Sequence, residues 1–104
     1  MRHKYTYYVC IITDKDRETL ETAIINTANE RSNHLRIEDL ASKALERNPE
    51  CVYIMYLEGY EDVLQAVNRE HVIRKMSIKD KKGMIKKMNP EWSFLNDKFY
   101  AEIR

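Results

Sequence analysis

The stretch from Arg69 to Trp92, REHVIRKMSIKDKKGMIKKMNPEW, constrains the fold more than any other part of the chain. Apolar side chains recur on one face of a 3.6-residue helix at Val63, Ala66, Val67 and Ile73. Glu70 falls on that apolar face. An unpaired buried carboxylate costs several kcal/mol or becomes protonated, so Glu70 needs a cation, a metal ion or hydrogen-bond donors. The pattern predicts either a structural ion pair or a metal-binding or catalytic carboxylate.

The second half of this stretch is strongly basic. Between Arg74 and Lys87, seven basic residues stand against one acid, whereas between Asp14 and Leu64 twelve acids stand against six bases. A net charge of only +1 hides this separation. It favours contact with a polyanion, although a solvated helix face is the commoner cause of a lysine run. The predicted nucleic-acid contacts are Arg74, Lys79, Lys81, Lys82, Lys86 and Lys87.

The length of 104 residues predicts one domain over residues 1–104. The chain has no long apolar run and no secretory signal at its N-terminus, so we expect a cytoplasmic protein without a membrane span. Cys10 and Cys51 lie in apolar runs without CxxC spacing, which favours free thiols in the core; a disulfide between them would need an oxidising compartment. The three histidines, including His71, have no metal-ligand spacing, and a helix turns His71 some 100° away from Glu70.

Three segments have the pattern of strands. Tyr5–Thr13 is rich in aromatic and β-branched residues, and Thr19–Ile25 can return beside it as an antiparallel strand. Cys51–Leu57 is almost continuously apolar, which suits a strand that is covered on both sides or lies at the centre of a sheet.

Helical patterns fill most of the remaining chain. We expect a short helix in Asn26–His34, a second helix ending near Asn48, and the Glu70 helix over Glu61–Lys75. Ser77 caps a further helix, with Asp80 in the capping-box position, and that helix stops at Asn89–Pro90. Trp92, Phe94, Leu95 and Phe99 are expected to fasten the tail to the core. The fold class is therefore α+β, a three-stranded antiparallel β-sheet flanked by α-helices.

The C-terminal half also resembles a known family. Glu58 to Trp92, EGYEDVLQAVNREHVIRKMSIKDKKGMIKKMNPEW, resembles without a gap the pattern EExEDxxEAIxREKQIKxWxRxKKxxLIxxxNPEW of the small stand-alone proteins in the GIY-YIG nuclease superfamily. The N-terminal YYVCIITDK is similar to the YYVYILTNK of that group. The resemblance implies the same α+β fold, nucleic acid as partner (DNA in preference to RNA), and Mg²⁺ or Mn²⁺ as cofactor if the chain is active.

Three site residues of the family are retained. The metal-binding glutamate falls on Glu70, the helix arginine on Arg31 and the late asparagine on Asn89. The resemblance implies that Glu70 holds one divalent cation opposite the scissile phosphate. If catalysis has decayed, Arg31 and Glu70 are expected to remain as an ion pair between two helices.

Both motif tyrosines of the family are replaced. The first position holds Cys10 and the second Glu21, and the motif glycine is Ala23. Losing one proton-transfer group typically removes roughly 10² to 10⁴ in rate. We therefore expect a nucleic-acid-binding protein with weak or absent metal-dependent phosphodiester cleavage. In the alternative, Tyr8, on the same strand face as Cys10, or Glu21 supplies the base of an active endonuclease.

A further alternative belongs to another class of function. The acidic flank from Asp14 to Asp62 is compatible with a protein-interaction module, or with a surface for a homodimer. Retention on heparin at moderate salt distinguishes the two classes, because only the nucleic-acid hypotheses require it.

Overall fold

The structure is a computed structural model that describes residues 5–27 and 41–103. Its elements in chain order are β1 (Tyr7–Thr13), β2 (Leu20–Asn26), α2 (Ser42–Arg47), β3 (Tyr53–Tyr60), α3 (Val63–Lys75), α4 (Ile78–Met88) and α5 (Asn96–Ile103). The predicted α+β class with a three-stranded antiparallel sheet is confirmed. Most of the predicted helix in Asn26–His34, including Arg31, lies outside the described residues.

The sheet has the order β2-β1-β3, and β1 pairs antiparallel with both neighbours. Cys10 lies opposite Ala23 on one side and Leu57 on the other. The apolar run Cys51–Leu57 had suggested a strand that is covered on both sides or lies at the centre of the sheet; β1 is the central strand and β3 is an edge strand. Both faces of β3 are nevertheless covered, since Ile54 belongs to one core cluster and Met55 to the other.

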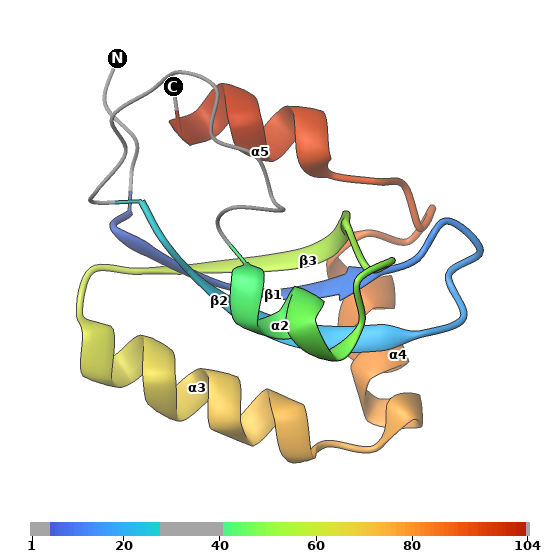
Figure 1. Cartoon of the computed structure of the whole chain (residues 1–104), viewed down its shortest axis with the longest axis horizontal. Helices are drawn as coiled ribbons and strands as arrows, with labels where there is room; N and C mark the ends of the chain where they lie inside the picture. Colours follow the sequence, from blue (N-terminus) through green and yellow to red (C-terminus); the bar gives the residue numbers. More distant parts are fainter. Residues whose placement is uncertain (1–4, 28–40, 104) are drawn as a thin grey trace.

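Helices cover the two faces of the sheet (Figure 1). α5 lies on one face, and α3 lies on the other together with α4. Side chains of β1 alternate between these layers because successive residues of a strand point to opposite faces. Tyr8 and Cys10 enter the core beneath α5 and α2, whereas Val9 and Ile11 enter the core beneath α3 and α4. All four side chains are buried.

The local helix predictions hold for α3 and α4. Ala66, Glu70 and Ile73 are buried along one face of α3, as the period requires, whereas Val63 at the helix start is 43% exposed. Ser77 caps α4, since its Oγ accepts a hydrogen bond of 3.1 Å from the backbone N–H of Asp80. No helix within residues 5–27 and 41–103 is both long and apolar enough to span a membrane.

The tail packs on the sheet as predicted, but it also forms α5, which the sequence patterns had not indicated. Phe99 is fully buried, and Asn96 completes the edge of β3 by accepting from Ile54 N and donating to Val52 O, both at 2.8 Å. Arg17, in the β1–β2 turn, donates to Trp92 O at 2.9 Å. The tail therefore contacts the β1–β2 turn and the start of β3, which lie at the same end of the sheet.

Candidate functional site

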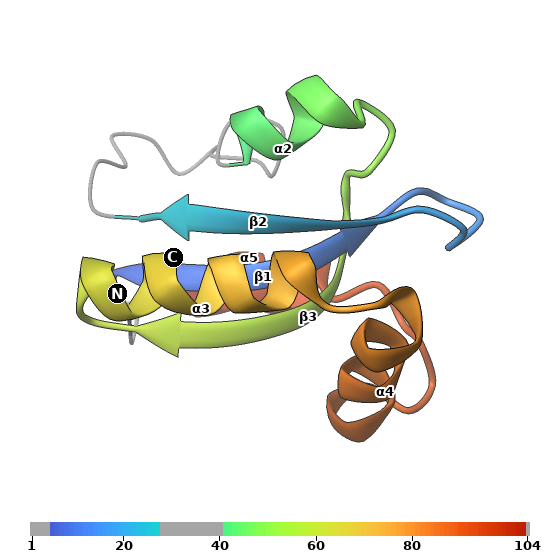
Figure 2. The ribbon, with the colours of Figure 1, turned by 90° about the horizontal axis from the view of Figure 1, so that it is seen from below.

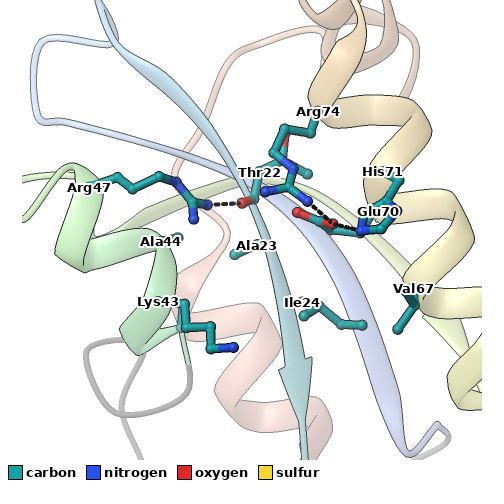
Figure 3. Close-up of a pocket in the computed structure, with 11 residues that line it drawn as sticks. Thr22, Ala23, Ile24, Lys43, Ala44, Arg47, Val67, Glu70, His71 and Arg74 are labelled. Carbon is teal, nitrogen blue, oxygen red and sulfur yellow. Dashed lines mark hydrogen bonds and ion pairs between the residues drawn. The ribbon is translucent and has the colours of Figure 1, made fainter.

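A pocket of about 320 Å³ lies beside the edge strand β2, between α2 and α3 (Figure 3). Its chemistry comes from six of the side chains that line it: Thr22 from β2, Lys43 and Arg47 from α2, and Glu70, His71 and Arg74 from α3. Three basic side chains and one carboxylate are therefore among the described residues that line the pocket.

Glu70 is the buried carboxylate of this pocket. The residue is 7% exposed, and its Oε1 accepts a hydrogen bond of 3.2 Å from Arg74 Nη2, one helical turn later. The predicted ion-pair partner, Arg31, lies outside the described residues; the partner that the structure shows is Arg74. His71 had been expected to turn away, yet it lines the same pocket with Nε2 at 3.8 Å from Glu70 Oε1.

The α2 wall of the pocket is organised by Glu21. Arg47 donates from Nε and Nη2 to Glu21 Oε1, at 3.2 and 3.1 Å, and Asn48 donates to Glu21 Oε2 at 2.6 Å. Both carboxylate oxygens of Glu21 are thus engaged in fastening α2 to β2. Lys43, one turn before Arg47, is exposed and has no partner among the described residues.

Thr22 lies on the floor of the pocket, and Figure 3 shows it between Arg47 and Arg74. Its hydroxyl is buried and has no hydrogen-bond partner among the residues that the structure describes. Leaving such a group unsatisfied costs about 1–3 kcal/mol. The sequence patterns did not single out Thr22, because a threonine in a strand is ordinary until its neighbours are known.

Two predicted site residues lie on the other face of the sheet. Tyr8 is 2% exposed and donates its phenolic hydrogen to Glu102 of α5. Burial, and then the Glu102 carboxylate, raise the pKa of Tyr8. Cys10 is fully buried, which raises the pKa of its thiol to about 12. The prediction that Tyr8 or Cys10 shares a site with Glu70 is wrong, because α3 covers the opposite strand face.

Asn89 is also separate from the pocket. It is 6% exposed, and its Nδ2 donates to Met55 O at 3.2 Å and to Ser93 O at 2.8 Å. These bonds fasten the end of α4 to β3, which is the sheet edge opposite β2. The predicted site role of Asn89 is therefore corrected to a structural one.

The lysines of α4 form a second basic surface. Figure 2 shows α2 and α4 on opposite sides of α3, so the α4 lysines do not belong to the pocket. Lys79, Lys82, Lys86 and Lys87 are exposed, as phosphate contacts require. Lys81 is only 8% exposed, because it shares the inner face of the helix with Ile85. Its burial removes Lys81 from the predicted set of phosphate contacts.

A second charged network, which the sequence patterns did not indicate, joins α3 to β3. Arg69 donates from Nε and Nη2 to the two carboxylate oxygens of Glu58, both at 2.9 Å. The hydroxyls of Tyr56 and Tyr60 donate to the same carboxylate. Burial opposes ionisation of Glu58, but the bonds from Arg69 and the tyrosines together lower its pKa. Burial, followed by the Glu58 carboxylate, raises the pKa of Tyr56 to about 12.

The pocket fits a divalent cation poorly. Mg²⁺ and Mn²⁺ prefer several oxygen ligands, whereas Glu70 is the one described carboxylate that lines the pocket and Arg74 already engages it. Within residues 5–27 and 41–103, no three His, Cys, Asp or Glu side chains are placed to hold a metal ion. The positive lining instead complements an anion.

Comparison of the chain with protein-family models, with curated proteins and with solved structures found no match.

Proposed function

We propose that the protein binds nucleic acid through phosphate contacts and has weak or absent phosphodiester cleavage. The observation that carries this proposal is the convergence of Lys43, Arg47 and Arg74 on one pocket beside β2. The resemblance of Glu58–Trp92 to the GIY-YIG nucleases supports the same class of partner, with DNA in preference to RNA. We place this activity in the cytoplasm, since both cysteines are free and buried.

The two guanidinium groups suit phosphate oxygens. Arginine presents several N–H donors in a planar fork that matches the geometry of a phosphate. Arg47 and Arg74 come from opposite walls of the pocket, and one carboxylate orients each of them. The exposed α4 lysines supply further, sequence-independent contacts along the backbone of a longer nucleic acid.

The same geometry explains why we propose little or no cleavage. Hydrolysis needs a proton acceptor beside the attacking water. Tyr8 and Cys10 lie on the other face of the sheet, and both oxygens of Glu21 are hydrogen-bonded. Glu70 is paired with Arg74. Among the described lining residues, His71 is the one remaining candidate acceptor, and no cluster of metal ligands accompanies it in the part of the chain that the structure describes.

Binding is tested by fluorescence anisotropy with a short DNA duplex at several salt concentrations. The double variant Lys43→Gln with Arg74→Gln should bind about tenfold to hundredfold more weakly, because it removes two charge-assisted interactions with phosphate. The slope of log affinity against log salt should fall by about 0.9 for each phosphate that the variant no longer neutralises. Lys98→Gln, which removes one positive charge from an exposed position on α5 outside the pocket, is the control for each of the two single variants, Lys43→Gln and Arg74→Gln. Unchanged affinity and slope in the double variant would refute the pocket as the phosphate site.

Glu70→Gln separates this proposal from the active-endonuclease alternative. The variant keeps the shape of the side chain and removes the pocket's carboxylate. DNA affinity should rise about twofold to fivefold, because the Arg74 partner is 44% exposed and such a charge interaction is worth up to about 1 kcal/mol. Neither wild type nor variant should nick plasmid DNA with Mg²⁺ or Mn²⁺. If the wild type nicks DNA and Glu70→Gln abolishes the nicking, Glu70 is a metal ligand and Glu21 becomes the leading base.

A protein-interaction module is the second candidate function. It rests on large apolar side chains that α3 and the start of α4 expose to solvent: Leu64 is 68% exposed, Val72 53% and Ile78 60%. Large apolar side chains exposed on α3 and at the start of α4 favour a protein partner or a homodimer. Sedimentation velocity without nucleic acid tests the homodimer, and absence of retention on heparin would favour this candidate over nucleic-acid binding.

A further inference from the structure

The pocket beside β2 has more hydrogen-bond donors than one internal phosphodiester group can engage. We infer that the pocket takes a terminal phosphate, a phosphomonoester at the end of a nucleic-acid strand. This inference rests on the proposed function and narrows its substrate class from any phosphate backbone to strand ends.

Several donors of the pocket are not engaged by the described residues. Arg47 uses Nε and Nη2 in its bonds to β2, which leaves Nη1, and Arg74 uses only Nη2, which leaves Nε and Nη1. The ammonium group of Lys43 adds a point charge from the α2 wall. A phosphomonoester presents three terminal oxygens to such a set, whereas an internal diester presents two.

The net positive charge of the lining also favours the more highly charged monoester over a diester. Lys43, Arg47 and Arg74 oppose Glu70, so the described lining residues carry a net charge of +2 before any protonation of His71. Glu21 does not line the pocket, but its carboxylate lies 3.1 Å from Arg47 and offsets one of these charges, which leaves a net charge of +1 for the lining together with Glu21. A phosphomonoester carries about −1.5 to −2 at neutral pH, whereas a diester carries only −1.

Thr22 gives an independent indication that the pocket is built for a ligand oxygen. Its buried hydroxyl has no partner among the described residues, although most buried polar groups in folded proteins are satisfied. The third oxygen of a terminal phosphate can accept the hydrogen bond that Thr22 lacks. A volume of about 320 Å³ also leaves room for the sugar that carries the phosphate.

The test uses one labelled single-stranded oligonucleotide in three forms: with a 5′-phosphate, with a 3′-phosphate, and with hydroxyl groups at both ends. Anisotropy titrations should show at least fivefold tighter binding of one phosphorylated form than of the hydroxyl form. Lys43→Gln and Arg74→Gln should remove this preference, and Lys98→Gln should keep it. A mononucleoside monophosphate should compete only at much higher concentration, because it lacks the backbone contacts.

Thr22→Val is the sharpest variant, since it removes the hydroxyl with almost no change of shape. It should reduce the preference for the phosphorylated form at least twofold while raising the midpoint of thermal unfolding, because an unsatisfied buried group is removed. A merely structural hydroxyl would not change the preference between ends.

Three outcomes overturn the inference in distinguishable ways. Equal binding of all three oligonucleotides refutes the terminal-phosphate site and leaves the proposed function standing. Binding of none refutes both. A preference that survives Lys43→Gln and Arg74→Gln shows that the strand end is recognised elsewhere on the protein.

Discussion

Replacing Cys10 by tyrosine should destabilise the protein by about 3 kcal/mol or more and should not restore hydrolysis. Cys10 is fully buried in the central strand, between Ala23 and Leu57 of the neighbouring strands, under the layer that contains Phe99. A phenol in place of a thiol adds a ring to a filled core, and overpacking of this kind typically costs 1–3 kcal/mol and occasionally more. The hydroxyl would also be buried on the sheet face opposite Glu70.

Urea unfolding of wild type and Cys10→Tyr measures this effect, with Cys10→Ala as the control for losing the thiol alone. The alanine variant deletes a single sulfur atom and should lose about 1 kcal/mol. If Cys10→Tyr instead keeps wild-type stability and gains Glu70-dependent nicking of DNA, the two side chains share one cleft, and the assignment of Cys10 and Glu70 to opposite sheet faces is wrong.

Glu58→Ala should lower the free energy of unfolding at pH 7 by about 2–3 kcal/mol. The change leaves Arg69 without its two charge-assisted hydrogen bonds, and the hydroxyls of Tyr56 and Tyr60 without their acceptor. The side chains of Glu58 and Arg69 are 20% and 36% exposed, so water compensates part of the loss. The junction of α3 with β3 should loosen, and with it the wall that carries Glu70.

The dependence of this loss of stability on pH follows from the direction in which the fold shifts the pKa of Glu58. The pKa of Glu58 is lower in the folded protein, so its ionisation stabilises the fold at pH values above the ordinary carboxyl pKa near 4.3. That contribution is lost as the pH falls through the lowered folded pKa. The difference in stability between wild type and Glu58→Ala should therefore shrink when urea unfolding is repeated at progressively lower pH below 4.

Tyr60→Phe provides a matched control for the network, because it removes one hydrogen bond of 2.7 Å and keeps the ion pair. It should cost only about 1 kcal/mol and keep most of the acid dependence of the wild type, because the bonds from Arg69 and Tyr56 still lower the pKa of Glu58. A difference between wild type and Glu58→Ala that stays constant from pH 7 to acid pH would mean that Glu58 stabilises the fold by packing alone.

The amino-acid sequence by itself determined the local features of this protein. Residue type and apolar runs indicated the three strands, and the period of 3.6 residues indicated α3, because both signals depend only on which side chains suit a strand or face a core. The start and end of α4 followed from Ser77 and Asn89, since capping bonds are local. The burial of Glu70 followed from the phase of its helix.

Only the tertiary structure decided which of these features meet. The alternation of side chains along β1 places Tyr8 and Cys10 on the same face of the strand, but it does not determine which helix covers that face. In the folded protein, α3 covers the face of Val9 and Ile11. The pairing of Glu58 with Arg69 joins a strand to a helix across eleven positions and has no periodic signal. The phosphate pocket likewise depends on α2 and α3 meeting over β2, because no segment of the sequence contains all of its charges.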